Sequence, residues 1–419
     1  MKKKIQSFIN VKVICGALIG ICLFNTACKK KEFMPEPEGQ QVPYVDSVQT
    51  SMQALLKTSP YKLFYAAWQR SHMEQFIIEK GEKRLMTLFV PDDAAMRAAG
   101  LDEAGINART PEQLDSLVMY HLLRDKMEVL GLQSQLISVS HTTFLVHPQL
   151  KQYLILPGNA GGNIVAYEYR HYTMVGKDGG LVINGNPCGN YKPTVVLNGI
   201  LWPVNRVLLP PTKHIIDYIN EDPRFSYLKE INEINKVIWD GIVFGSFPRL
   251  ADLDLGPAGD VVTFNAFLAP TNEAFHKAGF KDLADLEAVS NRFTPEPDWD
   301  NYKIDALIPT DSILAYHNWG RMYAQYGNYG RGPAKPSVFF TADMRNEAIG
   351  NYQLHTSGWK IDEYLMPLYF INEGNTVSIQ VKGSKAPPVK IIEANINTFE
   401  GPLHIVDGLL IPDGFKVHY

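Results

Sequence analysis

The chain contains, at residues 265–275, the segment NAFLAPTNEAF. Its apolar first half is typical of a strand, and Pro270 marks the point where such a strand stops. Thr271 follows directly, and its hydroxyl can cap the N-terminus of a helix that the next residues favour. The segment therefore predicts a strand, a cap and a short helix held against a sheet.

This segment is one of three sequence blocks that occur twice in the chain, in the same order. A related segment, TLFVPDDAAM, occupies residues 87–96. Farther along, LVMYH at residues 117–121 corresponds to ILAYH at residues 313–317, and NGILWPVNRVLLP at residues 198–210 corresponds to EGPLHIVDGLLIP at residues 400–412. We therefore predict a tandem duplication.

Residues between the blocks indicate where helices and strands lie. Apolar residues at helical spacing predict helices in residues 51–79 and again in residues 215–239. Residues 141–194 and 329–390, rich in Gly, Asn and Tyr, favour strands and turns. The last block is expected to form a buried strand that is interrupted at its Asp-Gly pair and resumes at residues 409–411.

The motif order resembles that of the fasciclin (FAS1) domain. Residues 269–275 reproduce the family's Ala-Pro-Thr-Asn-Glu-Ala-Phe motif, and the two Tyr-His pairs fit its middle motif. The closing strand of the second copy matches at Gly401, His404, Asp407, Gly408, Leu410 and Pro412. The first copy is more diverged and has Trp202, Asn205 and Arg206 where His, Asp and Gly are expected.

The resemblance implies an α+β fold of two tandem FAS1 domains. Each would have a compact twisted β-sheet or sandwich core with several short helices packed against it. The implied boundaries are residues 46–210 for the first, diverged domain and residues 213–419 for the second. The two prolines of the linker at residues 210–212 are expected to restrict how the domains move.

The same resemblance suggests candidate residues for binding. In fasciclin proteins the Tyr-His region has been tied to adhesion. With two residues of the closing strand, the corresponding set here is Tyr120, His121, Tyr316, His317, His404 and Asp407. A Tyr or His at the end of a helix can equally pack its ring while its polar tip finds a partner, so adhesion and packing both remain open.

The N-terminus indicates secretion. Three lysines precede an apolar run at residues 13–24, which is too short to span a bilayer and is typical of a signal peptide covering residues 1–27. The run ends in Asn-Thr-Ala before Cys28, which resembles a bacterial lipobox whose cysteine is lipidated. We expect a lipid anchor and polar tether at residues 28–45, as in lipoproteins of the Bacteroidetes type; a plain secretory signal is the alternative.

Catalytic and metal-binding patterns are weak. The segment DLDLG at residues 252–256 begins like a calcium loop but has Thr263 where a bidentate Glu is required. His141, His147 and His171 lack a carboxylate or cysteine at metal spacing and are expected to be structural. Cys188 is the single cysteine after the anchor, and a loop or core role is expected for it. We predict no enzyme activity, no metal and no cofactor.

Aromatic residues give the sharpest hint of a ligand. Trp319, Tyr323 and Tyr326 recur at helical spacing, and Trp299 lies in an insertion of the second copy. Exposed rings in a row stack against sugars, whereas the same spacing also suits a face buried in a core. The run at residues 167–172, YEYRHY, alternates in the same ambiguous way.

The net charge of the chain and its expected secretion limit the classes of partner that it can bind. The formal net charge is −4, and residues 1–27 contain four lysines and no acidic residue, so their removal makes the chain more acidic. That balance argues against nucleic acid or anionic lipid as the main partner, and the expected membrane contact is the N-terminal lipid alone. We predict a non-enzymatic adhesion or binding protein of the cell envelope, anchored to the outer membrane and facing the surface. Its ligand would be an extracellular protein or glycan; the alternative is a glycan-binding accessory lipoprotein of a polysaccharide uptake system.

Overall fold

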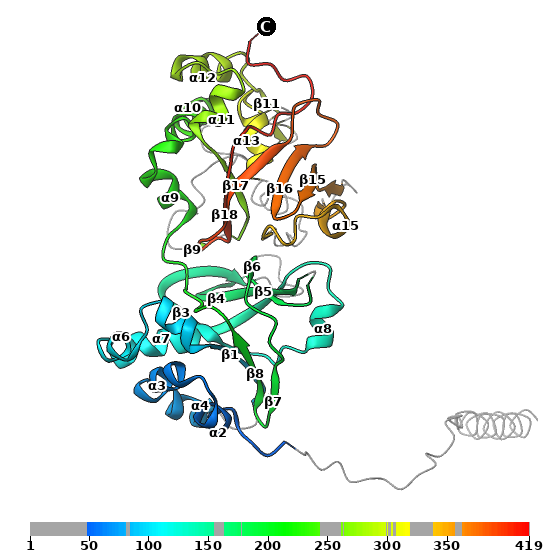
Figure 1. Ribbon diagram of the computed structural model, residues 1–419. Helices are drawn as coiled ribbons and strands as arrows, with labels where there is room; N and C mark the ends of the chain where they lie inside the picture. Colours follow the sequence, from blue (N-terminus) through cyan, green and yellow to red (C-terminus); the bar gives the residue numbers. More distant parts are fainter. Residues whose placement is uncertain are drawn as a thin grey trace, which may run out of the picture. The chain divides into compact units, whose positions relative to one another are not determined.

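The structure is a computed structural model. It describes residues 48–80, 84–154, 163–176, 178–243, 261–262, 264–298, 300, 303–304, 307–318, 338–356 and 363–418. Residues from Val48 onward form one compact unit. We call residues 48–210 the first repeat and residues 213–418 the second repeat (Figure 1).

The first repeat combines short helices with a long sheet. Its helices are α2 (Met52–Thr58), α3 (Lys62–Arg70), α4 (Met73–Lys80), α5 (Asp93–Ala98), α6 (Glu103–Asn107), α7 (Pro111–His121) and α8 (Val129–Gln133). Its strands are β1 (Met86–Pro91), β2 (Leu122–Leu123), β3 (Val139–Leu154), β4 (Asn163–Val175), β5 (Leu181–Ile183), β6 (Asn186–Pro187), β7 (Thr194–Val196) and β8 (Gly199–Val204). Their order in the sheet is β6-β5-β4-β3-β2-β1-β8-β7.

The second repeat has the same mixture. Its helices are α9 (Ile215–Glu221), η1 (Pro223–Phe225), α10 (Ser226–Val243), α11 (Asn272–Lys277), α12 (Leu283–Ser290), α13 (Asp311–His317) and α15 (Asn346–Ile349). Its strands are β9 (Val261–Val262), β10 (Phe267–Pro270), β11 (Pro297–Asp298), β12 (Lys303–Ile304), β13 (Gln353–Thr356), β14 (Glu363–Leu365), β15 (Leu368–Glu373), β16 (Thr376–Val381), β17 (Val389–Asn397) and β18 (Pro402–Val406). The main sheet has the order β10-β18-β17-β16-β15, whereas β9 pairs with β3 of the first repeat. The fold is α+β, as predicted.

The two repeats share one strand register, which supports the predicted duplication. In the first repeat β1 runs parallel to β8, and Pro91 lies opposite Val204. In the second, β10 runs parallel to β18, and Pro270 lies opposite Val406. The recurring first and last blocks therefore form the parallel strand pair of each sheet.

The recurring glycine where each closing strand begins allows this parallel pair to form. Gly199 has φ +142° and Gly401 has φ +143°. A Cβ at Gly199 would lie 1.9 Å from the Met86 carbonyl oxygen, and one at Gly401 would lie 2.2 Å from the Asn265 carbonyl oxygen. Any larger residue would thus push the two strands apart.

Helix caps follow the first motif closely. The Asp92 side chain accepts a hydrogen bond from the Ala95 N–H and begins α5. The Thr271 side chain accepts from the Ala274 N–H and begins α11. The prediction of strand, cap and short helix is confirmed in both copies.

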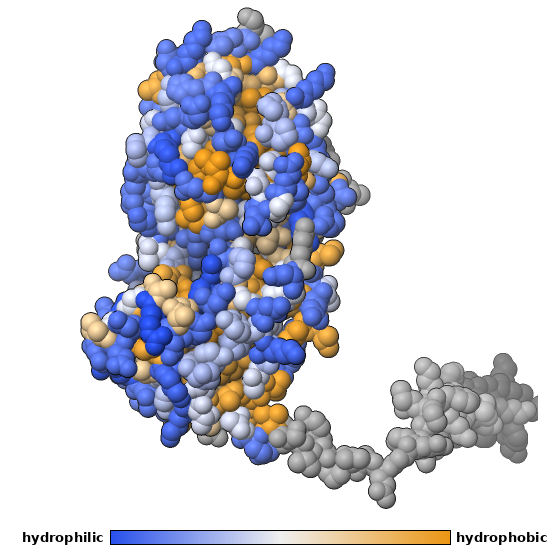
Figure 2. Space-filling view, viewed as in Figure 1, coloured by the Kyte–Doolittle hydropathy of each residue, from blue (hydrophilic) through white to orange (hydrophobic). Residues whose placement is uncertain are grey.

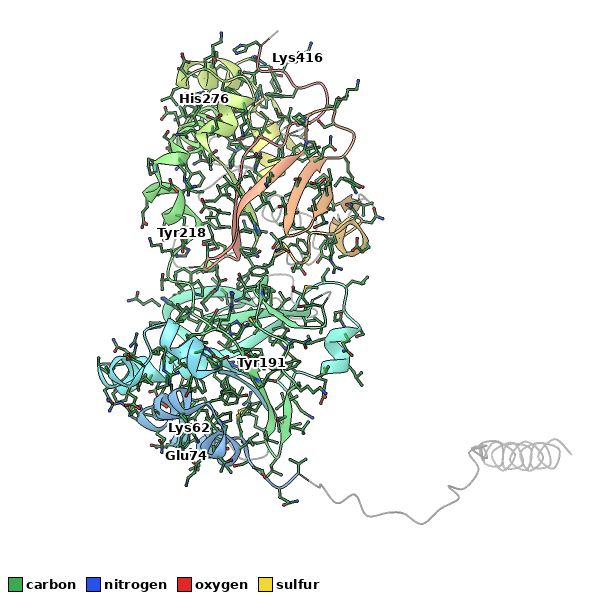
Figure 3. The ribbon with its side chains drawn as sticks, viewed as in Figure 1. Lys62, Glu74, Tyr191, Tyr218, His276 and Lys416 are labelled. Carbon is green, nitrogen blue, oxygen red and sulfur yellow. The ribbon has the colours of Figure 1, made fainter. Side chains whose placement is uncertain are left out.

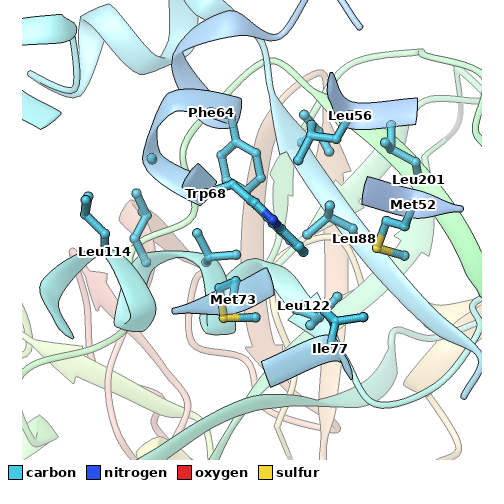
Figure 4. Packing of buried hydrophobic residues seen from close by; sticks show 14 of the residues in the cluster. Met52, Leu56, Phe64, Trp68, Met73, Ile77, Leu88, Leu114, Leu122 and Leu201 are labelled. Carbon is cyan, nitrogen blue, oxygen red and sulfur yellow. The ribbon is translucent and has the colours of Figure 1, made fainter. Parts of the chain in front are cut away.

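The helices of the first repeat cover its sheet with large apolar side chains. Phe64 and Trp68 of α3 are buried against Leu88 of β1 and Leu201 of β8 (Figure 4). Ile77 of α4 joins the same cluster. Because each of these helices buries one face, the helical spacing read from residues 51–79 marks the core side of α2, α3 and α4.

Two expectations about the second repeat need correction. Residues 409–411 do not resume the strand after the Asp-Gly pair, because the Leu410 N–H donates to the ring of His317 instead of to a neighbouring strand. The region of residues 329–390 is not strand and turn alone: it contains the short helix α15, whose Asn346 side chain bonds to the backbone of Phe370 in β15.

Candidate functional site

His121, at the C-terminus of α7, ties that helix to the segment after β8. The Leu208 N–H donates to its Nε2 atom at 3.0 Å, so the proton of the neutral ring lies on Nδ1. Nδ1 then donates to the Leu117 carbonyl oxygen at 2.8 Å. The ring is fully buried, and both of its nitrogens are used inside the first repeat.

His317, at the C-terminus of α13, makes the equivalent link in the second repeat. Its Nε2 accepts from the Leu410 N–H at 2.9 Å, and its Nδ1 donates to the Leu268 carbonyl oxygen at 2.7 Å. The acceptor is a residue of β10, whereas His121 donates to a residue of its own helix. His317 therefore joins three elements: α13, β10 and the segment after β18.

These rings are neutral at physiological pH. Burial lowers the pKa of His121 to about 4 and that of His317 to about 4, because the charged imidazolium loses its water. A neutral ring that both donates and accepts is what the two backbone partners require. The sites suit structural linkage and leave no free nitrogen for a ligand.

The two tyrosines of the motif differ in exposure. Tyr120 is fully buried; its ring lies 4.3 Å from the ring of His171, and its hydroxyl accepts from the Asn397 side chain at 3.4 Å. Tyr316 is partly buried against the sheet core of the second repeat, and burial raises its pKa. Of the two, only Tyr316 retains some contact with solvent.

The remaining two motif residues also lie within the packing of β18. The ring of His404 is fully buried; its Nδ1 accepts from the Asn395 N–H at 3.2 Å, and its Nε2 faces the Phe339 carbonyl oxygen at 3.2 Å. Burial lowers the pKa of His404 to about 4. Asp407 is half-buried and accepts from the Lys390 N–H at 2.8 Å, which holds the end of β18 against β17.

A cluster lies where β4 meets the turn before β18, and of its members the sequence pattern singled out only Tyr167, in the aromatic run at residues 167–172. The Tyr167 hydroxyl donates to the Phe399 carbonyl oxygen at 2.9 Å, and the two rings contact edge to face at 5.7 Å. Next to Phe399, the buried Glu400 carboxylate accepts from the Ile215 N–H at 3.0 Å and contacts the His214 ring at 2.5 Å. Tyr167 and Glu400 are both buried and bonded, and together they join β4 to the start of the second repeat. Its partners are far apart in the chain, which is why periodicity could not reveal them.

The hollow beside this junction is too small for an organic ligand. Tyr167, Arg170, Phe264 and Phe399 line it, and its volume is about 10 Å³. That is roughly the room for one water molecule. The junction therefore serves to join β4 to the second repeat, and binding is expected elsewhere.

Other polar side chains are also buried or bonded to groups within the fold. The Asn184 side chain contacts His171 Nδ1 at 3.3 Å, and burial lowers the pKa of that histidine to about 3. Burial raises the pKa of the Cys188 thiol to about 11, which keeps it protonated and unreactive. Figure 3 labels Tyr191 and His276; the first donates to the Asp92 carboxylate at 3.1 Å and the second contacts the Phe280 carbonyl oxygen at 3.0 Å.

The described residues provide neither a metal-binding cluster nor a membrane-spanning helix. Within them, no group of three His, Cys, Asp or Glu side chains is arranged to hold a metal ion. None of the helices described here has the length and apolar character needed to cross a bilayer.

Several predicted residues lie outside the described part of the chain. These are the anchor Cys28 and the four candidate glycan-stacking aromatics, Trp299, Trp319, Tyr323 and Tyr326. The anchor, the stacking role and the domain boundaries therefore stay predictions.

Comparison with known proteins bears on the first repeat directly. Residues 59–210 match the model of the fasciclin domain. This range begins just before α3 and ends in the segment that His121 holds after β8, so the fasciclin match covers both the parallel pair of β1 and β8 and its histidine link. Fasciclin domains are in general non-enzymatic adhesion or binding modules.

The chain was also compared with solved structures and with curated proteins. A solved structure of a FAS1 domain pair from the insect cell adhesion molecule fasciclin I is similar over 84% of this chain and 96% of that chain, with 10% sequence identity and a TM-score of 0.31. The comparison with curated proteins gave no match. The fasciclin assignment accordingly depends on the family model for residues 59–210.

Proposed function

We propose that this chain is a non-enzymatic adhesion or binding protein of the cell envelope, held to the outer membrane by a lipid on Cys28 and facing the cell surface. The observation that carries the proposal is the fasciclin match over residues 59–210, because domains of this kind act in general as adhesion or binding modules. The anchor is inferred from the sequence around Cys28.

The side-chain chemistry of the described residues supports a binding role over catalysis. His121, His317 and His404 are neutral and spend their ring nitrogens on backbone groups. The Cys188 thiol is buried, and its pKa of about 11 makes it a poor nucleophile at neutral pH. A catalytic site needs a group that is both activated and accessible.

The ligand is expected to contact the outer surface of the repeats and not the motif itself. The polar tips of His121 and His317 are enclosed, so a protein or glycan could reach them only if the link between helix and closing segment opened. Exposed side chains on loops and outer sheet faces are the accessible alternative.

The first experiment is protease treatment of intact cells that carry the wild-type chain or the Cys28→Ser variant, with a periplasmic lipoprotein as the protected control. We expect digestion of the wild-type chain at the surface and release of the variant from the membrane fraction. Adhesion of wild-type and deletion cells to protein-coated and polysaccharide-coated surfaces then tests binding. Protection of the chain in intact cells contradicts surface exposure, and unchanged adhesion to both coatings contradicts the adhesive role.

A further inference from the structure

Apolar side chains gather on the first repeat beside the point where the described chain begins. Leu85, Val195 and Leu197 have 50%, 49% and 41% of their surface exposed. Figure 2 shows apolar residues collected at this end, over β7 and β8. We call these three residues the entry patch.

Backbone pairing places the members of the entry patch close together. Met86 lies opposite Gly199 in the parallel pair of β1 and β8, and the Met86 N–H donates to the Asn198 carbonyl oxygen. Leu85 and Leu197 therefore lie at neighbouring positions where these two strands begin. Val195 belongs to the edge strand β7, which pairs with β8 on one side.

The chain enters the fold at the same place. The Leu197 N–H donates to the Thr50 carbonyl oxygen at 2.9 Å, and the Asn198 side chain accepts from the Met52 N–H at 2.8 Å. The segment that leads back to Cys28 thus starts beside Leu197. Exposed Arg84 directly precedes Leu85 and carries a charge that suits phosphate headgroups.

We propose that the entry patch rests on the membrane, inserting Leu85, Val195 and Leu197 into the headgroup region of the bilayer to which the chain is anchored. This inference rests on the proposed lipid at Cys28. Residues 28–47 are long enough, at about 3.5 Å per residue when extended, to let the repeats drift roughly 70 Å from the membrane. Since a tether raises the local concentration of its own bilayer, a small apolar patch with one basic neighbour is enough to hold this end of the repeat against the membrane.

The test uses the full mature chain with Cys28 replaced by Ser and an N-terminal histidine tag bound to vesicles that contain a nickel-chelating lipid. A fluorescent dye is attached at Val195→Cys or, as a matched control, at Val237→Cys on α10, where the native valine is 73% exposed. Cys188 is buried with a raised pKa, so the dye reacts at the introduced thiol. Lipids with a quencher near the headgroup report contact with the bilayer.

We expect at least about twofold stronger quenching at residue 195 than at residue 237. The double variant Leu85→Gln, Leu197→Gln should reduce quenching at residue 195 to the level of residue 237. The matched double variant Leu130→Gln, Leu136→Gln changes two exposed leucines of the same repeat and should have no effect.

Three results would overturn the proposal. These are equal quenching at the two dye positions, quenching that the entry-patch variant does not change, and a concentration-dependent change in dye emission without vesicles, which would indicate a second copy of the chain on the patch. Because the nickel lipid replaces the natural anchor, these results are independent of whether cells lipidate Cys28. Mass spectrometry of the N-terminal peptide from cells tests that modification separately.

Discussion

Acid should unfold both repeats through four buried histidines. The rings of His121 and His171 lie in the first repeat, and those of His317 and His404 lie in the second. Burial lowers the pKa to about 4 for three of them and to about 3 for His171, from an ordinary value of 6.5. Below pH 6.5 these histidines therefore bind protons in the unfolded chain but stay neutral in the folded chain until the pH nears 4.

The sign and size follow from this difference. The folded pKa is depressed, so the contribution of each neutral ring is complete above pH 6.5, falls as the pH drops and levels off near the folded value. At pH 5 each histidine lowers the free energy of unfolding by about 2 kcal/mol relative to pH 8. Two such residues per repeat amount to about 4 kcal/mol, which is a large part of the roughly 5–15 kcal/mol that a domain has.

The assay is urea unfolding at a series of pH values from 8 to 4.5, followed by tryptophan fluorescence and circular dichroism. The variant His317→Gln removes one titrating ring. We expect it to lose about 1–3 kcal/mol at pH 8, because the Leu410 N–H and the Leu268 carbonyl oxygen lose well-placed partners. Between pH 5 and 6 its unfolding free energy should fall less steeply than that of the wild type, by about 1.2 kcal/mol per pH unit.

The control is His72→Gln. His72 is an exposed residue that pairs with Asp115, and hydrogen bonding to Asp115 raises its pKa, which is the opposite direction to the shift of the buried histidines. Its removal should therefore not make the fall between pH 5 and 6 less steep. A wild-type unfolding free energy that is constant from pH 8 to pH 5, or a His317→Gln slope equal to that of the wild type, would refute the argument.

Three more predictions concern the strand pair, the thiol and a cap. Gly401→Ala should lower the free energy of unfolding by roughly 3 kcal/mol or more, because its Cβ would meet the Asn265 carbonyl oxygen at a φ that alanine rarely adopts. Gly374→Ala is the control: it has open space around its Cβ and should lower the free energy by about 1 kcal/mol in thermal unfolding. Cys188 should react with a thiol reagent at the rate of global unfolding, and rapid labelling of the native chain would contradict its burial. Asp92→Ala should lower the free energy of unfolding by about 1 kcal/mol by removing the α5 cap, and a midpoint unchanged in urea would contradict that role.

The sequence predicted the paired first and last strands and the helix caps because they depend on local signals. Pro91 and Pro270 end the strands that the pattern indicated, and Thr271 caps the helix that follows. The glycines that open the closing strands were visible as part of a repeated block. Glycine is required at these positions because a carbonyl oxygen of the neighbouring strand lies less than 2.5 Å from where a Cβ would be. That contact depends on the three-dimensional fold and cannot be read from the local sequence.

The histidine links show where local reasoning ends. The spacing placed His121 and His317 at helix ends and predicted that their polar tips would find partners. It could not predict that one ring donates to its own helix while the other donates to a strand, because the choice depends on how each helix meets its sheet. The same limit applies to Tyr167 and Phe399, which are joined only by the fold.

The divergence between the copies suggests that the two repeats are not interchangeable. Trp202 and His404 occupy the same register position, opposite Phe89 in β1 and Leu268 in β10. His404 connects β18 to Asn395 and to the Phe339 carbonyl oxygen, whereas Trp202 joins an apolar cluster in its repeat.

The links that both copies keep, from His121 to Leu208 and from His317 to Leu410, are the ones that hold the fold together. If packing is what preserves the shared motif, the residues that choose a ligand must lie where the copies differ. Exchanging the surface loops of one repeat for those of the other should then transfer binding, while exchanging the Tyr-His helix ends should change stability alone.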